Sequence, residues 1–347
     1  VEEYARVFAE YAKLMKRVDP GLKVVAVGEG NPDWDLPLLK RAGRLIDYIS
    51  IHAYHYRGQA PEYYQAVSSP LISDRRLSLL EHCIEVAEAT LAQQPTLGLV
   101  TPKAPRGIEI AFDEWNAWGW SHPFPNAFLD EESFTKPFQV NDRNEYYTLR
   151  EALFTARYLH IFHRHCRRLT MANFSPIVNV RGAIYADGRG VVLRPTYHVF
   201  DLYANHTGDV ALRTAVESPA YDVTVPWWRG NLQFRDVPYL DASTTVNREE
   251  ERLYLSVINV HKDTGLSARI EVRSAEVGGE AKVWTLNGPR VDAYNDWGHT
   301  DDVKVSEATT IRVAPTFEYT FPPHSVTMME MILTRPVSPL RERRLRK

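Results

Sequence analysis

Two patterns of apolar residues divide the chain near residue 206. Up to that point, apolar residues at spacings of three and four alternate with short continuous apolar runs, which is typical of helices and buried strands. Beyond it, short strand-like stretches are separated by Gly, Pro, Asn and Asp, with no helical period. We therefore expect an α/β domain over 1–206, an all-β domain over 207–334 and a separate tail over 335–347.

The first part predicts alternating helices and strands. Helices are expected over 1–18, around 77–91, over 145–166 and over 196–206, and strands over 22–28, 45–54, 108–115 and 169–174. Four strands joined by long crossovers indicate a parallel sheet, and their continuous apolar runs fit strands that are buried on both faces. In the first helix, one apolar face is predicted by the spacing of Tyr4, Phe8, Tyr11, Met15 and Val18.

The second part predicts an antiparallel β-sandwich. Its expected strands are 209–214, 252–261, 268–274, 281–286, 309–314 and 325–333. The tail is basic and has two prolines, so we expect a solvated, disordered end rather than an arm that binds nucleic acid.

Composition and charge narrow the class of protein. A length of 347 residues, 44% of them apolar and 24% charged, is typical of a globular protein with a sizeable core. A net charge of -3 gives no reason to propose nucleic acid or an anionic membrane as a partner, and no apolar run predicts a membrane span. Cys83 and Cys166 are expected to be free core thiols, and no metal site is expected.

Polar and aromatic residues gather where the predicted strands end. One strand runs into "DEWNAW", and another ends in "IHAYHY". Catalytic groups of parallel α/β barrels lie at such carboxyl-terminal strand ends. A carboxylate beside aromatic rings and a histidine suits glycosidic cleavage, in which one carboxylate attacks or activates water and a second protonates the leaving oxygen. On this pattern alone, an acidic pair at a strand end is still more often structural than catalytic.

The stretch "FDEWNAW" resembles the nucleophile motif of the α-L-arabinofuranosidases of glycoside hydrolase family 51. Further segments resemble these enzymes in the same order, among them "DYISIHAY", "ANFSPIVNV", "TYHVFDLYANH", "YLSVINVHKD" and "LNGPRVDAYND". The resemblance implies a (β/α)8 barrel, of which this chain holds strands five to eight, followed by a β-sandwich. It implies retaining, exo-acting removal of terminal α-L-arabinofuranosyl residues from polysaccharides and oligosaccharides, without a metal or organic cofactor.

The resemblance also assigns roles to single residues. Glu114 corresponds to the nucleophile, and Asn116 belongs to the same motif. His52 and Tyr54 match a histidine and a tyrosine near the nucleophile, and Trp118 matches a tryptophan of the sugar pocket. We therefore expect His52, Tyr54, Asn116 and Trp118 to contact substrate. Enzymes of this family often form hexamers, so a homo-oligomer is an open expectation.

The sequence departs from the family pattern in two places. Pro176 stands where some members have a substrate-contacting glutamine, which leaves the substrate preference open. The family's acid/base glutamate follows an asparagine at the end of the fourth barrel strand, and no Asn-Glu pair of that kind occurs here. Glu29, in "VAVGEGN", is expected to be an ordinary charged loop residue. The proton donor is therefore expected outside this chain, in a missing N-terminal half-barrel.

Two other functions remain open at this stage. One is a different activity on the same scaffold, such as a galactofuranosidase or an endo-acting β-glycanase. The other is a noncatalytic subunit that binds carbohydrate or supports assembly. The sequence indicates neither the natural polymer nor the cellular compartment.

Overall fold

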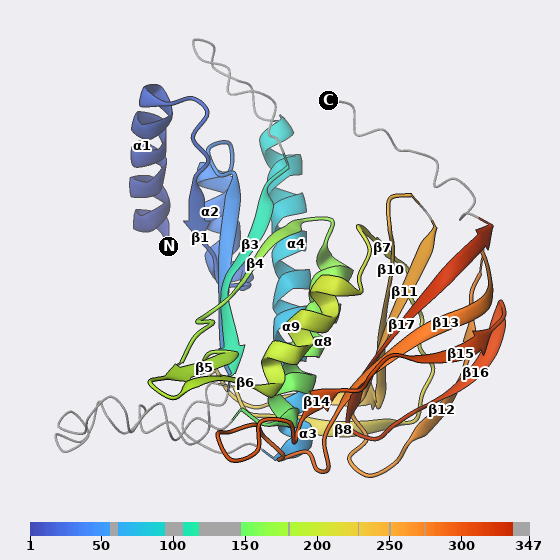
Figure 1. The fold of residues 1–347 in the computed structure, drawn as a ribbon. Coiled ribbons are helices and arrows are strands. Elements are labelled where there is room, and N and C mark those ends of the chain that lie inside the picture. Colours follow the sequence, from blue (N-terminus) through green and yellow to red (C-terminus); the bar gives the residue numbers. More distant parts are fainter. Residues whose placement is uncertain are drawn as a thin grey trace. The chain divides into compact units, whose positions relative to one another are not determined.

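The computed structural model describes residues 1–55, 62–93, 107–117, 147–179, 181–227, 229–249, 251–273 and 275–335 (Figure 1). Contacts divide the chain into two units. The first comprises Val1–His55, Pro70–Asn116 and His165–Ser175, and the second comprises Tyr56–Ser69, Ala117–Arg164 and Pro176–Lys347.

The first unit is an α/β layer built on a four-stranded sheet in the order β1-β2-β3-β4. Its strands are β1 (Val25–Val27), β2 (Tyr48–His55), β3 (Glu109–Ala117) and β4 (Leu169–Phe174), and its helices are α1 (Glu2–Val18), α2 (Pro32–Ala42) and α4 (Pro70–Gln93). The pairs β1–β2 and β3–β4 are parallel. Helix α1 packs on α2, and α2 packs on α4. The expected parallel α/β half-barrel is thus confirmed.

Helix α2 was not expected, because Pro32 and Pro37 both fall inside it. Its start signals are nevertheless present in the sequence. Asn31 is the N-cap and its side chain accepts the backbone N–H of Asp33, while Pro32 occupies the first turn, where no N–H donor is needed. Pro37 removes one internal hydrogen bond, which the helix tolerates because its inner face, including Leu38 and Leu39, is buried.

Burial on both faces holds for much of β2 and β3 but is wrong for the two edge strands. Val25 and Val27 of β1 and Met171 of β4 are exposed. The predicted face of α1 is also largely uncovered. The helix buries Ala5, Ala9 and Ala12, whose small side chains allow close packing on α2, and leaves Tyr11, Met15 and Val18 exposed. The first unit therefore presents an open apolar edge.

The part of the second unit that the structure describes is all-β apart from three helices. The helices are α3 (Tyr63–Ser68), α8 (Leu149–His165, up to Arg164 within this unit) and α9 (Pro195–Asn205). Its strands are β5 (Ile184–Asp187), β6 (Gly190–Leu193), β7 (Val210–Leu212), β8 (Ala220–Val225), β9 (Leu232–Pro238), β10 (Leu240–Val246), β11 (Arg252–Asn259), β12 (Leu266–Glu271), β13 (Glu276–Asn287), β14 (Lys304–Val305), β15 (Thr309–Val313), β16 (Thr316–Phe321) and β17 (Ser325–Arg335). No helix is found among the described residues after α9, as predicted.

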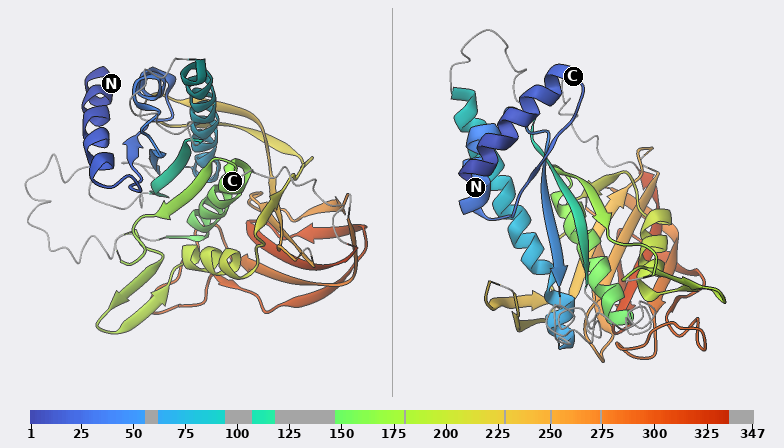
Figure 2. Two further views of the ribbon diagram at one scale, coloured as in Figure 1. Left: turned by 90° about the horizontal axis from the view of Figure 1, so that it is seen from above. Right: turned by 90° about the vertical axis from the view of Figure 1, so that its left-hand side faces the viewer.

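A seven-stranded antiparallel sheet forms the centre of this unit, with the order β14-β13-β17-β11-β10-β7 and β15 paired to β13. Side chains on β17 alternate between its two faces, as the strand period of two requires. Val326 and Met328 join a core with α8 and α9, while Met329 and Met331 join a second core with β12 and β16. Figure 2 shows green α8 and yellow-green α9 beside the orange and red strands.

Both cysteines were expected to be free thiols in the core, and the structure gives the burial of each. Cys83 is a buried free thiol, but Cys166 is exposed because it lies one residue beyond the end of α8, so its expected place in the core is wrong. Within the described part of the chain, no helix is long and apolar enough to cross a membrane.

Candidate functional site

The candidate site begins with a β-bulge in β3. Phe112 pairs with Ala172 of β4 and Trp115 pairs with Phe174, so Asp113 and Glu114 together oppose one residue of β4. A bulge breaks the alternation of side chains along a strand and redirects them locally. It explains why two consecutive acidic side chains are both partly exposed, although apolar residues on either side of them are buried.

The neighbouring strand β2 supplies the partners of both carboxylates. Ser50, His52 and Tyr54 are spaced two apart and therefore share one face of β2. Ser50 Oγ donates to Asp113 Oδ1 at 2.6 Å, and His52 Nε2 lies 3.1 Å from the same oxygen. Three residues of one strand thus converge on the two acidic residues of the next.

The described residues contact Glu114 through one of its two carboxylate oxygens. Tyr54 donates its hydroxyl hydrogen to Oε2 at 3.1 Å, and His52 Nδ1 lies 3.7 Å from that oxygen. Among the described residues, the other oxygen, Oε1, has no hydrogen-bond partner, and 47% of the side chain is exposed. A carboxylate with one oxygen fixed and the other open to solvent can attack an electrophilic carbon or activate a water molecule.

The remaining predicted residues have different environments. Asn116 is buried, and its Nδ2 donates to the carbonyl of Ser175 at 3.1 Å, which ties the ends of β3 and β4 together. Its expected contact with substrate stays a prediction. Trp118 lies outside the described residues. Pro176 is exposed and begins the stretch that follows β4 and Ser175.

Glu29 lies in the loop after β1, with β2 between that strand and β3. Two strand spacings amount to about 10 Å between backbones, against about 5–5.5 Å between the carboxyl groups of a retaining pair. Its backbone N–H is bound by Asp35 and its carbonyl by Arg76. This placement fits the expectation that Glu29 is a loop residue.

Ser50 was not predicted as a member of the site, and Asp113 was not placed at its centre. The signal was available, because Ser50 stands two positions before His52 on a strand whose other residues are largely apolar. No group of three or more His, Cys, Asp and Glu residues suited to a metal ion occurs among the described residues. The described side chains around Glu114 offer a second carboxylate, an imidazole and hydroxyl groups.

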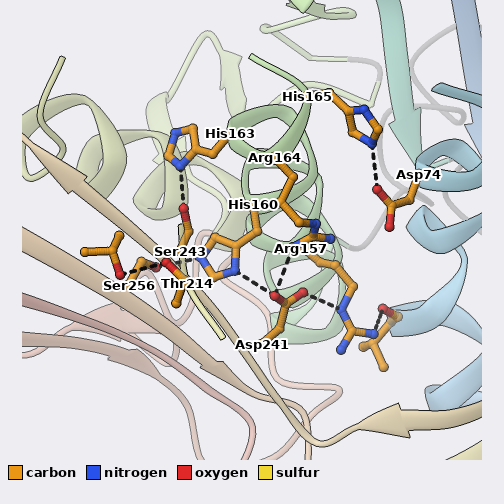
Figure 3. Close-up of polar contacts among 12 residues, drawn as sticks. Asp74, Arg157, His160, His163, Arg164, His165, Thr214, Asp241, Ser243 and Ser256 are labelled. Atoms are coloured by element: carbon orange, nitrogen blue, oxygen red, sulfur yellow. Dashed lines mark hydrogen bonds and ion pairs between the residues drawn. The ribbon is translucent and has the colours of Figure 1, made fainter. Parts of the chain in front are cut away.

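A second cluster in the second unit has the order of a catalytic triad. His160 on α8 lies between Asp241 on β10, 3.3 Å from Nδ1, and Ser256 on β11, 2.9 Å from Nε2 (Figure 3). Because an ionised Asp241 can only accept, Nδ1 carries the hydrogen and Nε2 accepts from Ser256. His160 and Ser256 are both buried, and the Ser256 oxygen also bonds to the hydroxyl of Tyr203.

Arginines complete this second cluster. Asp241 Oδ2 lies 3.3 Å from Nε of the buried Arg157, and Oδ1 lies 3.2 Å from Nη1 of Arg164. Burial raises the pKa of the Asp241 carboxyl, but His160 and the two arginines hold it well below its usual range. Since no reactive atom of this cluster is accessible, it is a structural network that attaches α8 to β10 and β11.

Comparisons with known proteins point to one family of enzymes. Residues 113–325 match the family model described as the α-L-arabinofuranosidase C-terminal domain. The chain is 28% identical over 342 residues to a probable α-L-arabinofuranosidase C of Aspergillus clavatus, covering 94% of this chain and 61% of that protein.

Solved structures give the same relationship. The α-L-arabinofuranosidase of Thermotoga maritima, in complex with arabinose, superposes with a TM-score of 0.79 at 31% identity, covering 96% of this chain and 62% of that one. The thermostable GH51 α-L-arabinofuranosidase of Thermotoga petrophila gives a TM-score of 0.76 at 31% identity, covering 95% and 62%. The chain thus spans 61% or 62% of the length of each of these three relatives.

Proposed function

Because the chain belongs to the α-L-arabinofuranosidases of glycoside hydrolase family 51, we propose that it carries the nucleophile of a retaining, exo-acting α-L-arabinofuranosidase. The observation that carries the proposal is the environment of Glu114. Its carboxylate lies near the end of a parallel strand, with one oxygen held by Tyr54 and the other open. The substrate class is a polysaccharide or oligosaccharide with terminal α-L-arabinofuranosyl residues.

In the proposed reaction, Glu114 Oε1 attacks the anomeric carbon while the glycosidic oxygen leaves. The product of this step is a glycosyl ester on Glu114, and water then cleaves it with retention of configuration. Tyr54 restrains the carboxylate through Oε2, which leaves Oε1 for the attack. The imidazole of His52 lies beside both acidic residues, 3.1 Å from Asp113 Oδ1 and 3.7 Å from Glu114 Oε2.

The proton for the leaving oxygen is proposed to come from a polypeptide segment outside this chain. Retaining cleavage needs a second carboxyl group about 5–5.5 Å from the nucleophile. Ser50 and His52 both contact Oδ1 of Asp113. Glu29 lies on the loop after β1, which is two strands away from β3 and Glu114. A half-barrel that completes the sheet beyond β1 and β4 would bring such a group to the open side of Glu114.

The proposal places the nucleophile in this chain and the proton donor in another segment. It is tested by measuring hydrolysis with the 347-residue chain alone and with the chain completed by an upstream half-barrel. General acid catalysis contributes roughly 10²–10⁴-fold, so the chain alone should fail on an arabino-oligosaccharide while the completed protein turns it over. Glu114→Gln in the completed protein should abolish turnover. Glu29→Gln is the matched control and should leave it intact.

Trapping the ester gives a second readout that does not need the proton donor. An arabinofuranose-configured 2-fluoro sugar with a good leaving group should add the mass of one sugar to the peptide that contains Glu114, and Glu114→Gln should prevent it. Robust hydrolysis that disappears with Glu29→Gln, or a label on any other residue, would overturn the assignment.

A further inference from the structure

The loop between β1 and α2 is held by two charged side chains next to the candidate site. Asp35, in the first turn of α2, is fully buried, and its two oxygens accept the backbone N–H groups of Glu29 at 2.9 Å and Asn31 at 2.7 Å. Burial raises the pKa of Asp35, and these two N–H groups partly offset the effect. Hydrogen bonds to a carboxylate are stronger than those between neutral groups, so Asp35 fixes the loop firmly to α2.

Arg76, on α4, joins that loop to β2. Its Nε and Nη2 donate to the carbonyl of Glu29 at 3.0 and 2.6 Å, and its Nη1 donates to the carbonyl of His52 at 2.8 Å. A guanidinium is rigid and planar, so it holds these two carbonyl groups in one fixed relation. Arg76 is therefore a direct link between the first loop of the sheet and the backbone of His52.

The need for this link follows from the unequal lengths of the strands. β1 ends at Val27, and the next N–H, from Gly28, pairs with the carbonyl of Ser50. His52 is two residues after Ser50 on β2, so its carbonyl points to the β1 side of that strand as well. At this position β1 has already ended and offers no backbone donor. Arg76 supplies the missing donor, so that β2 stays ordered as far as its catalytic end.

Two glycines show how tightly the loop is seated. Gly30 has φ +63°, and a Cβ there would lie 2.7 Å from Cβ of Arg76. A Cβ on Gly28 would lie 2.6 Å from Cγ1 of Ile49. Only glycine fits both positions, because the first needs a left-handed backbone and both need space that a side chain would take. The loop is thus pressed against Arg76 and β2.

We propose that Asp35 and Arg76 are positioning residues for the reaction at Glu114. Arg76 fixes the backbone of His52, whose ring lies 3.1 Å from Asp113 and 3.7 Å from Glu114. Asp35 fixes the loop between β1 and α2, whose Glu29 carbonyl accepts hydrogen bonds from Arg76. Their effect on the rate rests on the proposed function, since it requires Glu114 to be the nucleophile, whereas their effect on His52 does not.

The test compares Arg76→Ala, Arg76→Lys and Asp35→Asn with the matched control Arg75→Ala, which removes an exposed arginine from the same helix. The first readout is the ¹⁵N–¹H spectrum of the His52 ring in the histidine-labelled chain, assigned with His52→Gln. We expect Arg76→Ala to shift these signals, and Arg76→Lys to shift them less, because a lysine can serve one carbonyl group. Arg75→Ala should leave them unchanged.

The second readout is kinetic and uses the chain completed by its half-barrel. Misplacement of catalytic groups by about 1 Å can cost roughly 10²-fold, so Arg76→Ala should lower kcat by up to that factor. The loss should be larger in kcat than in KM, because Glu114 acts in the transition state, and any rise in KM would come from His52, which is expected to contact substrate. Arg76→Lys should recover part of the loss, and Asp35→Asn should behave like a weaker form of Arg76→Ala.

Each outcome decides the proposal. Unchanged His52 signals in Arg76→Ala would overturn it whatever the activity, and shifted signals with unchanged kcat would remove its catalytic part. If Arg76→Ala does not fold, the same comparison is made between Arg76→Lys and Arg75→Lys. An inactive unaltered protein would count against the proposed function, and the His52 spectrum would still decide whether Arg76 positions that ring.

Discussion

The reactivity assigned to Glu114 depends on how single atoms around its carboxylate are arranged. The bulge turns Asp113 and Glu114 toward β2, and the spacing of two along β2 presents a hydroxyl, an imidazole and a second hydroxyl to them. Asp113 receives two of these contacts on Oδ1, while Glu114 keeps one oxygen open. The two adjacent acids therefore have different tasks, one holding His52 and the other facing solvent.

Tyr54→Phe tests the tyrosine contact. A hydrogen bond to a charged group contributes about 1.5–3 kcal/mol, so we expect kcat/KM of the completed protein to fall roughly tenfold to a hundredfold. Tyr48→Phe is the matched control, because Tyr48 lies on the same strand and its hydroxyl accepts from Lys23 at the other end. Equal kcat/KM in Tyr54→Phe and the parent protein would contradict a role for the Tyr54 hydroxyl.

At the scale of elements, the spacing of apolar residues predicted the position of those helices and strands in which one periodicity dominates. β4 was predicted over its observed range, and the ends of α1 and α9 are within a residue or two of the predicted ones. Elements with mixed signals were missed. α2 contains two prolines, and β9 does not alternate regularly between buried and exposed residues.

The site was predictable to the extent that sequence spacing determines it. The pairing of Glu114 with His52 and Tyr54 followed from strand ends and from resemblance, and the structure brings their side chains together. The bulge was not predictable, because it depends on the register between β3 and β4, which spacing within one strand does not give. The same holds for Arg76, whose partners are backbone carbonyl groups of distant residues.

Helix α8 provides a test of the buried polar network. Asp241→Asn would leave the fully buried Arg157 without its carboxylate, and breaking such a pair typically costs about 3–5 kcal/mol. We expect the urea midpoint of unfolding to fall accordingly. Asp209→Asn is the control, because Asp209 pairs with Arg248 at the surface and should change the free energy of unfolding by less than about 1 kcal/mol. Similar losses in the two variants would contradict this account of the network.

The end of α8 should also give the stability a dependence on pH. Burial lowers the pKa of His165, but Asp74 at 2.9 Å and Glu81 at 3.1 Å outweigh this effect and raise it to about 9. The folded state therefore holds this proton more tightly than the unfolded state, in which the pKa is about 6.5. The stabilisation is fully present below pH 6.5 and is lost as the pH rises to about 9.

The free energy of unfolding, measured from pH 6.5 to 9 in the parent protein and in His165→Gln, checks this. The parent should lose stability relative to the variant as the pH rises. His163 has the opposite sign, because burial lowers its pKa to about 4, so its contribution is lost as the pH falls from 6.5. Parallel curves for the parent and His165→Gln would rule out the proposed contribution of His165.

At the scale of the whole molecule, the open edge of the first unit is the main unsatisfied feature. β1 and β4 both end the sheet, and the outward N–H and carbonyl of Val27 are bound by the side chains of Tyr4 and Trp34. These two contacts satisfy single backbone groups, but no strand of the described part of the chain pairs with the outer side of β1 or of β4. Together with coverage of 61% or 62% of its relatives, this edge supports the proposal that a further half-barrel completes the site.

The exposed face of α1 should then be part of the contact with that half-barrel. Tyr11, Leu14, Met15 and Val18 follow the i, i+3, i+4, i+7 spacing of a packing face, and from 45% to 89% of each residue is exposed. Leu14→Glu should leave the folding of the 347-residue chain unchanged, because this residue is already 60% exposed. It should weaken co-purification with a tagged upstream half-barrel and lower the turnover of the mixture. Ile332→Glu, at a residue of the β-sandwich that is 57% exposed, is the matched control and should assemble normally. If Leu14→Glu assembles as well as Ile332→Glu, the half-barrel does not pack on this face of α1.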